Sequence, residues 1–196
     1  MCYRLDTDIH WKTKMKSEKT LVDNICNGDR KAMRALYEKY SGYAMATAIR
    51  YVADRDDAAD IVQDAFVRIF SHIESFEWRG EGSLKSWIAR VVANEALTML
   101  RKRGNISFTD VIPDEASTEE PDIGAISNDT LRYMIAALPE GYRLVLNLYV
   151  FEGMSHKEIA KELGISPSTS ASQFFHAKRL LARMINTYLK KNDLNL

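Results

Sequence analysis

The residues from Ser155 to Arg183 constrain the fold most, because they specify the start, the end and the restart of a helix in fixed order. Ser155 and Glu158 have the spacing of a capping box, in which each side chain binds the backbone amide of the other residue. Gly164 follows the apolar positions of this helix and can adopt the left-handed conformation that ends it. Ser166-Pro167 then suits the N-cap and first position of a second helix. The pattern predicts a helix-turn-helix.

The second helix has two chemically different faces when about 100° is allowed per residue. One narrow sector holds mainly apolar side chains and should face the core: Ser170, Phe174, Ala177, Leu181, Met184 and Tyr188. The opposite sector holds hydroxyls, an aromatic ring, a histidine and two cations: Ser168, Ser172, Phe175, His176, Arg179 and Arg183. Because this sector has no carboxylate, it favours contact with phosphates and base edges. An ordinary amphipathic C-terminal helix is the alternative interpretation.

The periodicity is helical from Glu18 onward, without a convincing alternating strand, and it predicts an all-α protein. The net charge of the 196 residues is zero, which argues against a free-standing, strongly basic DNA binder. Residues 104–127 contain six acidic residues and no lysine or arginine, between two mildly basic blocks. We therefore expect two small, separately folded helical domains, 18–103 and 128–191, joined by a flexible acidic linker. The linker is either a solvated tether or a segment that lies in a basic channel.

The chain shows no pattern of a metal centre, a cofactor site or a membrane segment. Cys2 and Cys26 have neither metal-ligand spacing nor the density of a disulfide framework. No signal-peptide core and no apolar run long enough to cross a bilayer is present. We expect a soluble protein of a reducing cytoplasm, without a bound metal or cofactor and without stable membrane insertion.

A loop rich in aromatic and glycine residues precedes a helix that ends in cations. The loop spans Phe76 to Gly82, and the helix from Ser83 ends with Arg101-Lys102-Arg103. Rings that stack on bases, together with cations along a backbone, are typical of proteins that bind single-stranded DNA. Trp87 lies on the apolar stripe and is expected in the core, whereas Trp78 suits either packing or base contact.

The preceding helix, from Asp54 to Ile73, carries acidic residues in its first turns. Asp56, Asp57 and Asp60 have the D-D-x-x-D spacing that resembles the magnesium-diphosphate motif of isoprenoid synthases. No second aspartate-rich motif is present, and the helical block is too short to enclose a prenyl chain. Acids that complement the positive end of a helix explain the spacing better, so an enzyme is a distant alternative.

Taken in order, these segments resemble the small extracytoplasmic-function (ECF) group of bacterial RNA polymerase sigma factors. The resemblance covers the chain from about Glu18 to Tyr188. The segment Asp57–Phe66 looks like the polymerase-binding helix of the family, and Gly82–Arg103 looks like its promoter-melting and −10-reading segment. Leu138-Pro139, Arg143 and the helix-turn-helix match its −35-reading domain. The order, the spacing and the linker make the match specific.

The resemblance implies a sigma factor, not an enzyme, that binds core RNA polymerase and directs promoter-specific initiation. Residues implied for the −35 element are Ser168, Thr169, Ser172, Gln173, Phe175, His176, Lys178, Arg179 and Arg183. Those implied for reading and melting the −10 element are Trp78, Arg79, Ser83, Arg90, Asn94, Arg101, Lys102 and Arg103. Those implied for polymerase binding are Asp57, Asp60, Gln63 and Asp64. The implied partners are promoter DNA, the clamp coiled coil of the largest polymerase subunit, the flap of the second-largest subunit, and an anti-sigma factor.

The recognition helix departs from the family pattern in its second and third turns. Ala171 and Gln173 stand where basic residues are usual, Ser170 where an apolar residue is usual, and His176 where arginine is frequent. Fewer cations weaken phosphate anchoring, so the −35 sequence of relatives does not transfer. A helix-turn-helix regulator that works without polymerase is the main alternative, but residues 18–103 show no ligand, phosphoryl-acceptor or dimerisation domain.

Overall fold

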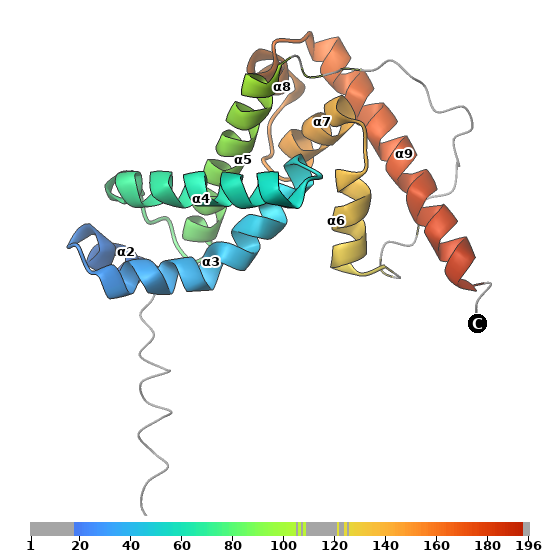
Figure 1. The fold of residues 1–196 in the computed structure, drawn as a ribbon. Coiled ribbons are helices and arrows are strands. Elements are labelled where there is room, and N and C mark those ends of the chain that lie inside the picture. The colour runs from blue at the N-terminus through green and yellow to red at the C-terminus, as the bar shows by residue number, and fades with distance from the viewer. Residues whose placement is uncertain are drawn as a thin grey trace, which may run out of the picture.

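The computed structural model describes residues 18–104, positions 106, 108, 121 and 124, and residues 126–193, with side chains as far as 191. All regular structure in these ranges is helical, in agreement with the prediction (Figure 1). The elements are α2 (Glu18–Cys26), α3 (Arg30–Tyr51), α4 (Arg55–His72), η1 (Ile73–Ser75), α5 (Ser83–Arg103), α6 (Asn128–Ala136), α7 (Glu140–Val150), α8 (His156–Leu163) and α9 (Pro167–Asp193). The six acids of the predicted linker lie outside the described residues.

Aspartate caps fix the starts of α3 and α4. The carboxylate of Asp29 accepts the backbone N–H groups of Lys31 and Ala32, at 2.8 and 3.3 Å. Asp54 accepts those of Asp56 and Asp57 in the same way, at 2.8 and 3.0 Å. Each cap satisfies amides that have no partner inside the helix. The sequence predicts both starts within one residue, because Asp29 and Asp54 each directly precede a run with helical periodicity.

In the first block, α3, α4 and α5 pack together and α2 lies against α3 (Figure 1). Their fully buried side chains recur at helical spacing, as in Ile61 and Ile69 of α4 and Leu84 and Ile88 of α5. The same i, i+4 spacing of apolar residues can be read in the sequence, where it predicts helices with one buried face. Leu36 of α3 is also fully buried and completes the centre of the core.

The second block has an apolar cluster of its own and also shares part of the core of the first block. Five buried residues form one cluster inside the block: Ile135, Leu138, Tyr142, Leu146 and Ala177. Four others join the core of the first block: Leu144, Val145, Leu148 and Ile159. Helix α7 is apolar on two sides, and such a helix is stable only when neighbours cover both of them. One side faces α9, and the other faces α3.

Two helix ends differ from the expected positions. The apolar pattern before Gly153 predicts a helix from Glu140 to Glu152, but α7 already ends at Val150. The sequence also predicts Ser83 as the N-cap of its helix, but Ser83 is the first residue of α5, and Gly82 holds the cap position with φ 82°. Left-handed backbone at position 82 suits glycine, and it lets the chain turn sharply into α5. Precise domain boundaries stay a prediction.

Candidate nucleic-acid interface

Local capping sets the angle between α8 and α9. The capping box is present: Ser155 Oγ accepts the N–H of Glu158, and the Ser155 N–H donates to Glu158 Oε2 at 2.8 Å. The Ser155 N–H and hydroxyl, which both donate to the carboxylate, lower the pKa of the Glu158 carboxyl. Gly164 ends α8 with φ 68°, and Ser166 Oγ accepts the N–H of Thr169 at 3.0 Å at the start of α9. The predicted helix-turn-helix is therefore confirmed in geometry.

Side-chain contacts lock α9 against α7 and α8. The ring of His156 stacks on Tyr149 with centroids 4.7 Å apart, and His156 Nδ1 lies 3.0 Å from Ser170 Oγ. Phe174 packs against both rings, with its centroid 4.4 Å from that of Tyr149 and 5.9 Å from that of His156. Ser170 is fully buried, as predicted, because its hydroxyl has a partner inside this cluster. These contacts with α7 and α8 fix the orientation of α9 and so determine which of its residues face outward.

That outer face presents an aromatic ring beside cations. Phe175 is 51% exposed, although a phenyl ring normally avoids water. The guanidinium carbon of Arg179 lies 5.2 Å from the centre of this ring, within cation–π range. Ser168, Ser172, Lys178 and Arg183 are exposed around it, and α9 has no carboxylate before Asp193. The surface is suited to phosphates and to the apolar edge of a base.

Among the residues predicted for the −35 contact, Gln173 is buried, and His176 and Thr169 are half-buried. Gln173 is fully buried, so a base edge cannot reach its amide in this structure. His176 is half-buried, with its ring centroid 5.8 Å from that of Tyr142. Thr169 is also half-buried, and its hydroxyl lies 2.8 Å from Ser166 Oγ. Both α7 and α8 pack against α9, so α9 buries a wider arc than a two-face division assumes.

A cavity of about 390 Å³ lies where the aromatic loop meets α5. Its walls combine aromatic rings, hydroxyls and charged side chains: Ser75, Phe76, Glu77, Arg79, Ser83, Ser86, Trp87 and Arg90. The rings of Phe76 and Trp87 meet at 5.4 Å between centroids. Ser83 Oγ donates to the Gly80 carbonyl at 2.6 Å and accepts the Arg79 N–H at 3.3 Å, which holds the loop over the cavity.

The two tryptophans of this region differ in their relation to the cavity. Trp87 packs against the core of the first block, as expected, and its half-buried ring also lines the cavity. Trp78, for which packing and base contact were both open, does not line it. Position on the apolar stripe does not distinguish a ring that is covered on both faces from one that is covered on a single face. Phe76, which follows η1 directly, supplies the second ring and was not among the predicted contacts. The pairing of these two rings appears only in three dimensions.

Polar side chains continue from this cavity along α5. Arg90 and Asn94 are exposed one turn apart, and Arg101, Lys102 and Arg103 are exposed at the end of the helix. Arg101 binds Glu162 of α8, through both the carboxylate and the backbone carbonyl, the latter at 3.0 Å. Arg90, Asn94 and Arg101 therefore lie along one line of α5, and Arg101 is already in contact with the second block.

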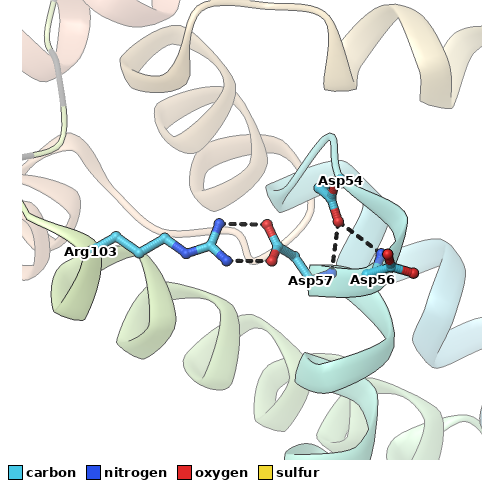
Figure 2. Close-up of polar contacts among 4 residues, drawn as sticks. All are labelled: Asp54, Asp56, Asp57 and Arg103. Carbon is cyan, nitrogen blue, oxygen red and sulfur yellow. Dashed lines mark hydrogen bonds and ion pairs between the residues drawn. The ribbon is translucent and has the colours of Figure 1, made fainter.

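The acidic start of α4 is tied to the end of α5 (Figure 2). Both terminal nitrogens of the Arg103 guanidinium donate to the two carboxylate oxygens of Asp57. This fork lowers the pKa of the Asp57 carboxyl. Two residues predicted for different partners, polymerase and DNA, thus bind each other in this structure. Asp60, Gln63 and Asp64 are exposed along α4, next to Val67, an apolar side chain that is 66% exposed.

The described residues contain no group of three or more histidine, cysteine, aspartate or glutamate side chains placed to hold a metal ion. Within the D-D-x-x-D segment, the carboxylate of Asp57 forms an ion pair with Arg103, and Asp54, just before the segment, is the N-cap of α4. Among the helices that the structure describes, none is both long enough and apolar enough to cross a membrane.

Comparison with known families identifies both blocks. The family model of sigma-70 region 2 matches residues 36–106, and that of sigma-70 region 4 matches residues 128–181. The chain belongs to the sigma-70 family of RNA polymerase sigma factors. Its relatives place it, more particularly, among sigma factors of the ECF type. It is a transcription initiation factor and not an enzyme, and its two helical domains correspond to regions 2 and 4.

The relatives are similar over nearly their whole length. The RNA polymerase sigma-H factor of Pseudomonas aeruginosa is 26% identical over 190 residues, which cover 90% of this chain and 97% of that protein. The ECF RNA polymerase sigma-E factor of Escherichia coli K12 is 27% identical over 189 residues, covering 89% and 97%. A solved complex of the sigma factor RpoE with the anti-sigma factor NepR, from Bartonella quintana, is 23% identical, covers 80% of this chain and 98% of that chain, and has a TM-score of 0.47.

Proposed function

We propose that this sigma factor reads promoters at two separate elements, each through one of the surfaces described above. In the second block, α9 enters the major groove of the −35 element and presents Phe175, Arg179 and Arg183. The observation that carries this assignment is the exposed ring of Phe175 beside cations on a face without carboxylates. Gln173 is left out of the contact set because it is buried.

The first block opens the −10 element and holds an extruded base. The cavity of about 390 Å³ is large enough for a base, and the Phe76–Trp87 pair offers it a stacking surface. Arg79 and Arg90, on its walls, can bind the phosphates that flank the base. Asn94 continues the path along α5. We add Trp87 and Phe76 to the predicted contacts and treat Trp78 as secondary.

Polymerase binding is assigned to the exposed acidic face of α4. Asp60, Gln63 and Asp64 supply polar contacts for the clamp coiled coil of the largest subunit, and Val67 supplies an apolar one. The flap of the second-largest subunit and an anti-sigma factor are further partners that the family resemblance implies. The chain works in the bacterial cytoplasm, where polymerase and promoter DNA meet.

Run-off transcription with core polymerase on genomic fragments, followed by mapping of the start sites, tests this function. We expect new start sites only when the chain is present, with two shared sequence elements upstream of them. Identical start sites with and without the chain would refute the proposal.

The polymerase surface has its own test. Asp64→Ala should reduce retention of core polymerase in a pull-down, whereas Asp23→Ala, which removes an exposed carboxylate from α2, should not. Equal retention by both variants would show that α4 is not the docking helix.

A further inference from the structure

Among the described residues, ion pairs join α4 to α5 at two separate points. Near the start of α4, the Arg103 guanidinium donates to both carboxylate oxygens of Asp57 (Figure 2). Farther along α4, Arg68 Nε lies 2.5 Å from Glu95 Oε1. About three turns of α4 separate Asp57 from Arg68, and about two turns of α5 separate Glu95 from Arg103. Because the pairs lie at two points, they hold both the angle and the register between the helices.

Both carboxylates of these pairs are largely covered. The side chain of Glu95 is 10% exposed, and that of Asp57 is 18% exposed. A carboxylate with so little access to water needs a bound cation or hydrogen-bond donors. Asp60 and Asp64, by contrast, are exposed on the outer face of α4. Asp57 therefore faces α5, whereas its exposed neighbours face a partner.

The surroundings of Arg103 do not suit a contact with DNA. Its hydrogen bonds to Asp57 are the main reason that the pKa of the guanidinium is raised, and the negative charges of Asp54 and Asp60 add to this effect. A DNA phosphate that approached Arg103 would also approach these three carboxylates and be repelled by them. Lys102, next to Arg103, is exposed and has no such fork.

We infer that Asp57 and Arg103 contact neither polymerase nor DNA: they are positioning residues, which hold the last turn of α5 on the polymerase-binding helix α4. This inference rests on the proposed function and adds two residues to those that place the −10 surface. When α4 is docked on polymerase, the pair sets where the exposed cations of that last turn, Arg101 and Lys102, meet the opened strand.

The test uses the complete initiation complex: core polymerase, the full chain and a promoter mapped by run-off transcription. Permanganate reactivity of unpaired thymines measures strand opening, and retention of the chain by core polymerase measures docking. Asp57→Ala and Arg103→Ala should each lower the opened fraction by about fivefold, the upper range for an exposed ion pair. The double variant should be no worse than either single variant, because all three lack the same pair.

The charge exchange Asp57→Arg/Arg103→Asp should open the promoter more fully than either alanine variant, because it rebuilds the pair in reverse. Retention by core polymerase should stay unchanged in all these variants. A general loss of structure would lower opening and retention together. Glu38→Ala is the matched control, because it breaks an exposed ion pair with Arg34 within α3, and it should change neither readout.

Three results would overturn the inference. Weaker core retention by Asp57→Ala would make Asp57 a polymerase contact. A smaller salt slope of promoter binding in Arg103→Ala, but not in Asp57→Ala, would make Arg103 a phosphate contact. Losses that add in the double variant would show that the two residues act separately. Any of these, with normal opening by the wild-type chain, refutes the inference alone; a wild-type chain that docks and opens no promoter refutes the proposed function as well.

Discussion

Replacing Asn147 by alanine should lower the stability of the first block, although Asn147 lies in the second. Its amide nitrogen donates to the Arg50 carbonyl at 2.7 Å across the junction where α7 of the second block packs against α3 of the first, and to the Arg143 carbonyl at 2.9 Å within α7. Alanine removes both bonds, which the fully buried Asn147 side chain makes, and leaves the two carbonyls without this donor. The mutation therefore weakens the contact that ties the end of α3 to α7.

Each of the two hydrogen bonds contributes about 1 kcal/mol net, so the free energy of unfolding should fall by about 2 kcal/mol. With a urea m-value near 3 kcal/mol/M, expected for a chain of this size, the unfolding midpoint should move down by roughly 0.7 M. A shift of that size is several times the uncertainty of a midpoint measurement.

Tryptophan fluorescence makes the assay specific for the first block. Trp78 and Trp87 lie in that block, Trp11 precedes it, and residues 128–196 contain no tryptophan. A shift in the fluorescence midpoint therefore reports destabilisation transmitted across the junction. Asn27→Ala, which removes an exposed side-chain bond to the Asp23 carbonyl, is the control and should shift it little. An unchanged fluorescence midpoint in Asn147→Ala, with a lower midpoint in helix content, would mean that the blocks unfold separately.

Three further outcomes follow from individual residues. Gly164→Ala should lower the free energy of unfolding by about 1 kcal/mol, because Gly164 has φ +68° and a Cβ there would meet no neighbour. Gly42→Ala is the control: Gly42 lies inside a helix with open space around it, so alanine should raise the free energy of unfolding by about 0.5–1 kcal/mol. Equal effects of the two substitutions in thermal unfolding would contradict this reasoning. Burial raises the pKa of Tyr51 well above its usual value, so its stabilising contribution holds below about pH 10 and disappears as the pH rises further. Between about pH 9 and 11, the Tyr51→Phe variant should therefore lose less free energy of unfolding than the control Tyr133→Phe, which replaces a ring that is 65% exposed. Equal losses in the two variants would contradict this role of Tyr51. Arg179→Ala should weaken binding to a mapped −35 duplex and reduce the salt slope by about 0.9, and an unchanged slope would remove this contact.

The sequence predicted those features that depend on neighbouring residues in the chain. Helix starts at Asp29, Asp54 and Ser155, and the left-handed end at Gly164, follow from side chains within four residues, and all are confirmed. The helix-turn-helix follows for the same reason. The sigma family was indicated by the order of several such segments, and the family models confirm it.

Features that depend on packing between distant helices were missed. The burial of Gln173 results from two helices that cover α9, and the position of Trp87 beside Phe76 results from the path of the loop. The Arg103–Asp57 pair joins residues 46 positions apart, each of which was assigned to a different partner. Charge and periodicity describe one helix at a time, so they cannot show that two such groups neutralise each other.

Twenty-four residues connect the end of α5 at Arg103 to the start of α6 at Asn128. Fully extended, a connection of this length reaches at most about 80 Å. For a segment as flexible as its composition predicts, it keeps each block at an effective concentration on the order of millimolar around the other. A junction of only millimolar intrinsic affinity would therefore be closed about half of the time. Doubling the length of the connection would weaken the association of the two blocks by only about 0.6 kcal/mol. The contacts of α7 and α8, rather than the length of the connection, therefore determine how often the two blocks are associated.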